Sequence, residues 1–411
     1  MAISTNISKK NIFYYLKGDK MIWALTVLLA IFSFIPVYSS SSNLAYLYGD
    51  GGTFGYLLKH FVHLFLGFVM LFFVHKIPYH YFKAFSILLM PVIVVLLVYT
   101  LAQGETMGGA NASRWIKIPF LGAGFQTSNV ASVVLMIYVA RYLSKIYQKE
   151  ITFKETLLPL WVPVGIVLAL ILPANFSTTA IIFSMVIVLV FLGGYPLKYI
   201  GIILLAGLIA LSLFVLAAKA FPDVFLNRVD TWISRVENFT KEGDSKEDYQ
   251  IERAKIAIAN GGFAGEGIGK SIQRNFLPQS SSDFIFAIII EEMGLIGGFG
   301  VMLAYLLILF RLVIISTKAN TIFGKLLVIG VGLPIIFQAL INMAVAVELF
   351  PVTGQTLPLI SSGGTSIWMT CIALGIVQSV SAKREEIREK EESENAESSI
   401  ENPLDILSET L

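Results

Sequence analysis

Long apolar runs separated by short polar segments dominate the chain. A helix needs roughly 20 apolar residues to cross the hydrocarbon core of a bilayer. The pattern therefore predicts ten transmembrane helices, at 21–38, 57–75, 82–101, 126–144, 157–172, 176–193, 198–218, 283–310, 324–347 and 357–381. The expected fold class is an all-α polytopic membrane protein.

The distribution of lysine and arginine predicts how these helices are oriented. Short cytoplasmic loops carry an excess of both residues. The segments on one side of the ten-helix pattern hold 18 of the 30, whereas the short loops on the other side hold only Lys59, Arg114 and Lys117. Both termini are therefore expected in the cytoplasm.

This topology divides the chain into three parts. Residues 1–20 form a cytoplasmic N-terminal segment, residues 21–382 a ten-helix membrane domain, and residues 383–411 a charged cytoplasmic tail. The tail is expected to be a short helix that frays into disorder. The first apolar run lacks the features of a removable signal peptide and is expected to be retained.

One large extracytoplasmic loop, residues 219–282, is expected between the seventh and eighth helices. Its segment "FLNRVDTWISRVENF" has the spacing of an amphipathic helix that lies at the membrane surface. Such a helix either covers the bundle or serves as a platform for a lipid-linked substrate.

Composition narrows the chemistry. The chain is 56% hydrophobic and only 14% charged, with a mean hydropathy of +0.75. The single cysteine, Cys371, excludes an intramolecular disulfide. The four histidines lack zinc-type spacing, and a structural role is favoured for His60 and His63. No nucleic-acid partner is expected.

Asp283 stands where the chain enters the eighth apolar run, in "SSSDFIFAIIIEE". An aspartate there can cap the helix by accepting backbone N–H groups. Because Ser281 or Ser282 could cap equally well, a second interpretation is open. A partly desolvated carboxylate at the outer mouth of a membrane protein suits a general base.

Glu291 and Glu292 follow within the same apolar run. At 1.5 Å per residue, Glu291 lies about 12 Å deeper than Asp283, and both glutamates project from other faces of the helix. Acids inside a membrane are functional candidates by default. Here internal hydrogen bonding between helices near mid-bilayer is favoured.

A glycine-rich run, "IAIANGGFAGEGIGKS", precedes this helix at 256–271. No strand precedes it, and it faces outward, so a nucleotide-binding interpretation is rejected. A close-packed loop is the default interpretation. The alternative is an anion site for a diphosphate, formed by Lys270, Ser271 and Arg274.

Two further outer segments contain candidate substrate-binding residues. Prolines and glycines break the chain within "NMAVAVELFPVTGQTLPLISSGGTS", and irregular backbone at membrane depth is tolerated where it is buried or lines a cavity. The loop at 102–125 adds a cation beside a tryptophan, which serves as an interfacial anchor or in phosphate recognition. The candidates in these segments are Arg114, Trp115, Lys117, Thr353, Gly354, Ser361, Gly363 and Gly364, with Asn175 and Asn342 as polar intramembrane residues.

Together these motifs resemble the SEDS family of bacterial membrane glycosyltransferases. "LPQSSSDFIFAIIIEEMGLIGG" is similar to the family pattern LPxxxxDFIFxxxxEExGxxG, and "PVTGQTLPLISSGGTS" to PxTGxxLPxxSxGGSS. "ASRWI" and "FQTSN" match weaker family motifs. The similarity extends through the tenth predicted helix.

The resemblance implies that the protein polymerises lipid II into glycan strands outside the bacterial cytoplasmic membrane. Asp283 would deprotonate the acceptor 4-hydroxyl, which displaces undecaprenyl diphosphate from the growing strand with inversion. Cations would stabilise the leaving group, either the basic residues named above or a divalent cation, Mg²⁺ or Mn²⁺. No other cofactor is expected.

The resemblance also implies partners. These are a class B penicillin-binding protein, which is a transpeptidase, and other membrane proteins of the division machinery. Within the family, "GEGIGKS" and "NRVDTWISRVENF" are more similar to the division member than to the elongation member, which implies action at the septum.

The sequence departs from the family pattern at several positions. Asn129 and Ser132 replace a glutamate–lysine pair, Asn175 and Gln279 replace acids, and Glu348 replaces a small residue. Asp283 is retained, as a catalytic assignment requires.

Two other functions remain open from the sequence. A lipid II flippase would need a polar path, for which the candidates are Asn175, Gln338, Asn342, Glu291 and Glu292. Those residues equally suit hydrogen bonds between helices. A scaffold that only activates a transpeptidase would allow Asp283 to be changed freely.

We predict that Arg114→Ala weakens the use of a lipid-linked substrate, because a cation facing the diphosphate is lost. The measurement is the initial rate of glycan synthesis over a range of lipid II concentrations. Superimposable rate curves for the variant and the parent protein would contradict the assignment.

Overall fold

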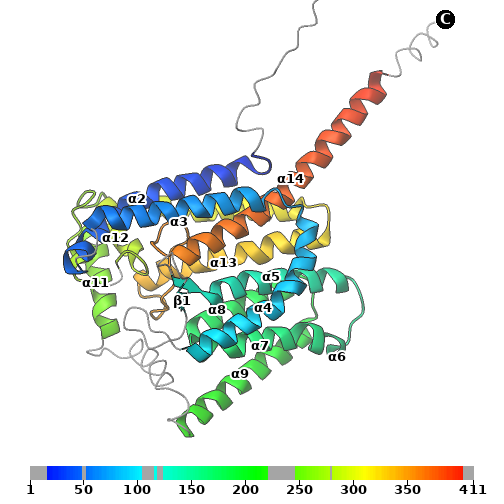
Figure 1. Ribbon diagram of the computed structural model, residues 1–411, viewed down its shortest axis with the longest axis horizontal. Coiled ribbons are helices and arrows are strands. Elements are labelled where there is room, and N and C mark those ends of the chain that lie inside the picture. Colours follow the sequence, from blue (N-terminus) through cyan, green and yellow to red (C-terminus); the bar gives the residue numbers. More distant parts are fainter. Residues whose placement is uncertain are drawn as a thin grey trace, which may run out of the picture.

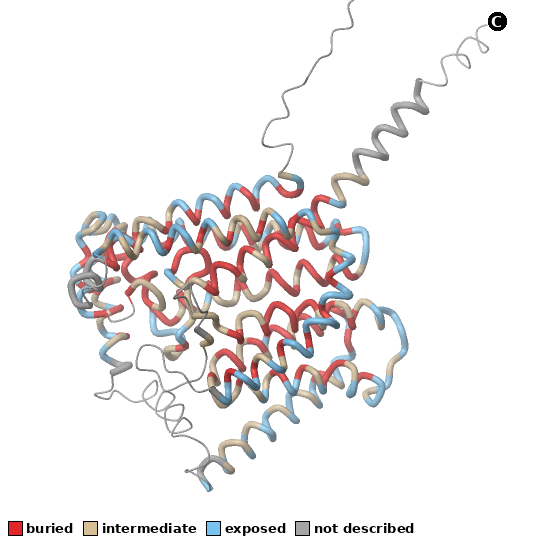
Figure 2. Tube along the Cα trace, in the orientation of Figure 1, coloured by how far each residue is buried: buried red, intermediate tan, exposed pale blue. Residues whose placement is uncertain are grey.

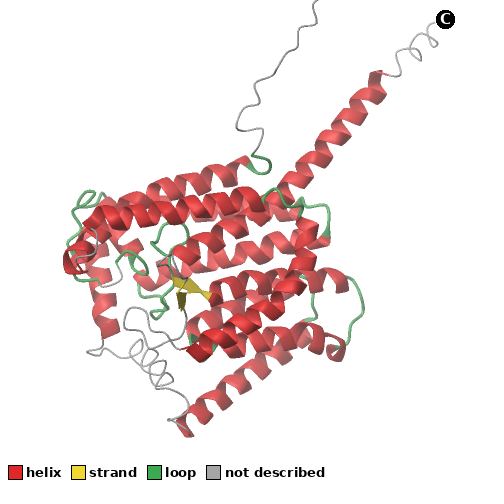
Figure 3. Cartoon of the chain, viewed as in Figure 1, coloured by secondary structure: helices red, strands yellow, loops and turns green. Residues whose placement is uncertain are grey.

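The computed structural model describes residues 16–48, 52–103, 115–117, 124–220, 246–277 and 280–400. Helices form a bundle with one small hairpin near one end (Figures 1 and 3). The elements are α2 (Lys20–Tyr48), α3 (Gly52–Val74), η1 (Tyr79–Tyr81), α4 (Phe82–Gln103), β1 (Trp115–Lys117), β2 (Gly124–Gln126), α5 (Thr127–Ile146), α6 (Phe153–Thr156), the π-turn η2 (Leu157–Trp161), α7 (Val162–Ile171), α8 (Phe176–Leu192), α9 (Leu197–Ala220), α11 (Lys246–Gly261), η3 (Gln273–Asn275), α12 (Ile285–Thr317), α13 (Ile322–Ala346) and α14 (Gly364–Ile400).

The predicted all-α membrane fold is confirmed, and each of the ten predicted spans coincides with a helix or a run of helices. Among the described residues, nine such segments are long and apolar enough to cross a membrane. The sixth predicted span is α8, an apolar helix of only 17 residues. The fifth is composite, since α6, η2 and α7 follow one another without a gap. The inward or outward orientation stays a prediction.

Three expected boundaries need correction. α12 begins at Ile285 rather than at 283, and α14 begins at Gly364 rather than at 357. Residues 357–363 turn instead, because Pro358 and Gly363 disfavour a helix there. At the other end, α14 continues through the charged tail to Ile400, so the helix expected at the start of the tail is continuous with the last span.

Burial is greatest in the middle of the bundle (Figure 2), where α5, α13 and α14 lie. α3 and α14 approach closely because small residues face each other. A side chain placed on Gly67 would stand 2.9 Å from the Cys371 sulfur, which is fully buried. By contrast, α9 lies at the edge of the bundle with exposed leucines (Figures 1 and 2), as a lipid-facing helix should.

α12 is interrupted at Gly294, whose φ of 67° and ψ of −172° are accessible only to glycine. The break leaves backbone groups without intrahelical partners, and the glycine-rich loop supplies them. Glu266 N donates to Glu291 O at 2.9 Å, and Gly267 N donates to Glu292 O at 3.0 Å. The loop therefore packs directly against the break. This is the close-packed loop that the sequence pattern favours over an anion site.

Contact between this loop and α12 leaves no room for side chains. A Cβ on Gly261 would lie 2.0 Å from Ile290 O, and one on Gly265 would lie 2.3 Å from Glu292 O. The glycines are used for backbone approach within the protein itself.

We predict that Gly294→Ala destabilises the protein by about 3 kcal/mol or more, because the strained backbone adds to a steric clash. The added Cβ would stand 2.2 Å from Phe263 O. Thermal unfolding in detergent measures the effect. Gly300→Ala in the same helix is the control, since its Cβ would meet nothing within 4 Å. That change should be neutral or stabilising by up to about 1 kcal/mol, and equal losses in both variants would contradict the prediction.

Candidate active site

Asp283 lies in the turn that precedes α12 and is partly exposed. Phe284 occupies the cap position of α12, and no side chain caps the helix there. The capping interpretation of Asp283 is therefore not supported by the geometry. Its carboxylate faces the segment after α13, since Oδ2 lies 3.5 Å from the position that a Cβ on Gly354 would take. Gly354 has a φ of 67°, a conformation that glycine adopts without strain.

Serine side chains hold the backbone on the N-terminal side of Asp283. Ser361 Oγ donates to Ser282 O at 2.6 Å and accepts from Leu357 N at 2.7 Å. Ser362 donates to Ser281 O through both its backbone N and its Oγ, each at 3.0 Å. The "LPLISSGG" turn is thereby fastened to the turn that carries Asp283.

Asn342 completes this attachment from α13. Its Nδ2 donates to Asp283 O at 2.8 Å and to Gln355 O at 2.7 Å. Gln355 Nε2 in turn donates to Thr178 Oγ1 of α8 at 3.2 Å. One amide therefore connects the two broken segments, and the carboxylate position is fixed by backbone contacts from several elements.

The hairpin of β1 and β2 reaches the same region. Thr365 Oγ1, at the start of α14, donates to Gly124 O at 3.0 Å and accepts from Gln126 N at 3.2 Å. The strands pair antiparallel, with Lys117 opposite Gly124. Trp115 and Lys117 thus belong to a hairpin docked beside Gly363 and Gly364. These four residues are among the candidates for substrate binding predicted from the sequence. Arg114 and the amphipathic segment 225–239 lie outside the described residues.

His63 is a neighbour of this region that the sequence did not indicate. A Cβ on Gly364 would lie 2.5 Å from His63 Nε2, so glycine leaves the space that the imidazole fills. The ring also stacks on Trp368 with centroids 5.5 Å apart. His60 differs, being buried with Nε2 2.7 Å from Ser33 Oγ. No local pattern distinguishes the two histidines, because the glycine that accommodates His63 is distant in the sequence.

Ser271 and Arg274 do not join Asp283 but belong to a second polar cluster. Ser271 Oγ donates to a Glu291 carboxylate oxygen, and the Arg274 guanidinium donates to Ser39 O at 3.2 Å. Glu292 accepts from Ser39 Oγ and from Ser271 N. Lys270 is exposed on the adjoining loop.

The hydrogen-bond partners of the two glutamates differ from those expected. Glu291 also accepts from the backbone N of Ile272 and Gln273, each at 3.2 Å. Both acids therefore bind the loop that precedes α12, a contact that the sequence did not predict. The break at Gly294 accounts for the difference, since it lets the loop fold against the helix. Only the contact of Glu292 with α2 fits the expected bonding between helices.

Asn175 and Gln338, two candidates for a transport path, make fixed contacts. Asn175 caps α8 by accepting from Thr178 N at 3.2 Å. Gln338 Nε2 donates to Thr356 Oγ1 at 3.0 Å and to Ser366 Oγ at 3.1 Å. The contacts of Gln338 are hydrogen bonds between elements, the alternative that the sequence left open, whereas Asn175 only caps its own helix.

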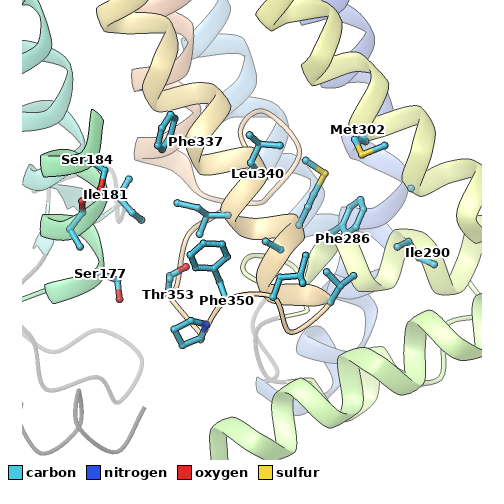
Figure 4. A pocket seen from close by; sticks show the side chains of 18 of the residues that line it. Ser177, Ile181, Ser184, Phe286, Ile290, Met302, Phe337, Leu340, Phe350 and Thr353 are labelled. Atoms are coloured by element: carbon cyan, nitrogen blue, oxygen red, sulfur yellow. Dashed lines mark hydrogen bonds between the residues drawn. The ribbon is translucent and has the colours of Figure 1, made fainter. Parts of the chain in front are cut away.

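A cavity of about 790 Å³ opens between α8, α12, α13 and the segment after α13 (Figure 4). Its lining is almost entirely apolar and includes Phe286, Met302, Phe337 and Leu340. Thr353 lines it beside Gly354, and Phe286 is one helical turn from Asp283. The cavity is thus an apolar groove that reaches Thr353, and the Asp283 carboxylate faces the adjacent Gly354 without itself lining the groove.

The described residues contain no group of three His, Cys, Asp or Glu side chains suited to a metal ion. Mg²⁺ is commonly bound through one or two carboxylates together with substrate phosphates. A divalent cation bound in that way would take some of its ligands from the substrate.

Comparison with known sequences gives the family. Residues 19–386 match the family of cell cycle proteins that includes FtsW, RodA and SpoVE. The chain belongs to this family, which confirms the resemblance described above.

Curated relatives cover most of the chain. A protein of Geobacter sp. (strain M18), named a probable peptidoglycan glycosyltransferase FtsW, is 30% identical over 89% of this chain and 97% of its own length. The protein of the same name from Coxiella burnetii is 32% identical over 82% of this chain and 88% of its own length. Stage V sporulation protein E of Bacillus subtilis is 31% identical over 88% and 96%.

Solved structures show the same fold. A chain from a structure titled for polymerization and crosslinking by a peptidoglycan synthase complex superposes with a TM-score of 0.67 and 25% identity, covering 89% of this chain and 98% of its own. The rod shape determining protein RodA of Thermus thermophilus gives 0.63 and 22% identity, covering 89% and 97%.

We predict that Ser361→Ala costs about 1–3 kcal/mol and lowers catalytic activity, because a buried serine loses a donor and an acceptor contact. Ser362→Ala is the matched control, since Ser362 is exposed and its backbone N keeps the contact with Ser281. Thermal unfolding and glycan synthesis are measured together. Equal behaviour of the two variants would contradict the fastening role of Ser361.

Proposed function

We propose that the protein is a peptidoglycan glycosyltransferase that polymerises lipid II into glycan strands at the outer face of the bacterial cytoplasmic membrane. The observation that carries the proposal is the position of Asp283 beside Gly354, next to the apolar groove. A lipid-linked substrate requires that combination, because its hydrocarbon chain and its sugar need different surroundings. The names of the relatives support the same activity.

Asp283 is the general base in this proposal. It accepts the proton of the acceptor sugar's 4-hydroxyl while that oxygen attacks the anomeric carbon of the donor. The bond to the diphosphate breaks, and undecaprenyl diphosphate departs. Attack from the opposite side inverts the configuration at the anomeric carbon, with no covalent enzyme intermediate.

The hairpin carries the cations assigned to the leaving group. Lys117 belongs to β1, which docks beside the glycine pair that begins α14, and Arg114 immediately precedes this strand. Positive charge there stabilises the negative charge that develops on the diphosphate. Lys270 and Arg274 are less suited, since the contacts of Arg274 are with Ser39.

A partner and a location complete the proposal. A solved structure of similar fold comes from a peptidoglycan synthase complex. We propose that this chain likewise works with a class B penicillin-binding transpeptidase, together with other division membrane proteins. Relatives named FtsW favour a role at the division septum.

The alternative functions receive less support. A flippase needs polar groups that line an alternating path, yet Asn175 caps α8, and Gln338 and Asn342 are engaged in contacts that hold the broken segments. A scaffold needs neither the groove nor a carboxylate next to it. The polymerase uses both features.

We predict that Asp283→Asn reduces glycan synthesis to background while folding and partner binding persist. The amide is isosteric but cannot accept the hydroxyl proton, and the contact of Asn342 with the backbone of residue 283 is retained. The purified protein with its transpeptidase is incubated with lipid II, and polymer is measured on gels.

The matched control is Glu252→Gln, the same acid-to-amide change at an exposed position of α11. It should leave synthesis unchanged. Normal polymerisation by the Asp283→Asn variant would refute the general-base assignment. Transport of lipid II without polymerisation by the parent protein would instead favour the flippase.

A further inference from the structure

A second hollow lies at the opposite end of α12 from Asp283. It has a volume of about 350 Å³ and forms where α2 begins, where Arg311 projects from α12, and where α14 leaves the bundle. Arg311 is roughly 40 Å from Asp283 along the helix at 1.5 Å per residue. The catalytic proposal uses none of the residues that line this hollow.

The acidic groups around the hollow already have partners. Asp19 accepts from Arg311 Nε at 3.2 Å and caps α2 by accepting from Met21 N and Ile22 N, each at 3.0 Å. Glu385 accepts from Gly18 N at 3.2 Å. Both carboxylates line the hollow, but they are outnumbered by three cations that also line it, Lys20, Arg311 and Arg384.

Among the described residues, two of the cations that line the hollow are not paired with acidic side chains. Within the described part of the chain, Lys20 and Arg384 form no ion pair with an acidic side chain, and both line the hollow. Ser381 lines it as well and is only 7% exposed. A hydroxyl and two cations that line the same hollow are a set of donors that fits a phosphate group.

An apolar surface continues from the hollow along α2. Met21 lines the hollow and is 40% exposed, and Leu28 and Ile31 follow on the outside of the helix at 57% and 65%. A free phosphate would make no use of this surface, whereas the acyl chains of a lipid would cover it.

We propose that this hollow binds the phosphate group of an anionic phospholipid in the leaflet at this end of the bundle. Lys20 and Arg384 supply charge and Ser381 donates a hydrogen bond, while the acyl chains lie along α2. Clustered basic residues at the membrane surface attract anionic lipids, and the buried serine makes the site specific rather than diffuse. The site is independent of the proposed catalytic activity.

The test uses the full-length protein in nanodiscs of phosphatidylcholine alone or mixed with phosphatidylglycerol. Lipids retained after release are identified by native mass spectrometry, and thermal stability is measured in parallel. The parent protein should retain phosphatidylglycerol preferentially and gain stability from it. Lys20→Ala combined with Arg384→Ala should lower the retention roughly tenfold or more, the size expected for two cations beside an anionic lipid.

A control pair, Lys154→Ala with Lys198→Ala, removes equal charge from exposed positions that do not line the hollow. It should retain the lipid as the parent does, while Ser381→Ala alone should lower retention. Equal losses in both charge pairs would reduce the effect to diffuse attraction and overturn the site. Unchanged retention in the variant that lacks both Lys20 and Arg384 would overturn it directly. Inorganic phosphate is the third arm, and a stability gain from it equal to that from the lipid would overturn the assignment to a phospholipid.

Discussion

Backbone polar groups need hydrogen-bond partners inside an apolar bundle, and the arrangement around Asp283 depends on this constraint. Three stretches there are not helical: the turn before α12, the break at Gly294, and the segment between α13 and α14. Each has hydrogen-bond partners outside its own stretch. Ser361 serves the turn at Ser282, and the glycine-rich loop serves the break. Ser361, Ser362 and Asn342 therefore hold the turn that carries the carboxylate in place.

The groove and the carboxylate represent two different environments set side by side. The walls of the groove are apolar and provide a hydrocarbon-like environment. The turn before α12 offers a partly exposed charged group. A molecule that is half hydrocarbon and half carbohydrate can therefore be positioned along its length by solvation alone. Specific contacts then need to fix only its reacting end.

Much of the fold could be predicted from hydropathy, because long apolar runs leave few alternatives to spanning helices. The sequence motifs also indicated which residues lie near one another, since Gly354 and Ser361 both contact the turn that carries Asp283. The break at Gly294 could not be predicted, because apolar residues continue through it without a change of pattern. Because the break was not predicted, the contacts of Glu291 with the glycine-rich loop were not predicted either.

Other parts of the site were beyond local sequence reasoning. His63 meets Gly364 only through the packing of α3 on α14. Arg274 was grouped with the substrate site on charge alone, whereas its contacts with Ser39 depend on how the loop folds over α2. The continuation of α14 through the charged tail shows that high charge does not prevent helix formation when a stable helix precedes it.

The packing of α3 against α14 has a practical chemical consequence. The sulfur atom opposite Gly67 is the only thiol in the chain, and it is sealed between two helices. Maleimides and other alkylating reagents that act from water should therefore leave the native polypeptide unmodified while it is folded. A cysteine introduced at any exposed position can then carry a spectroscopic probe without first altering the natural sequence.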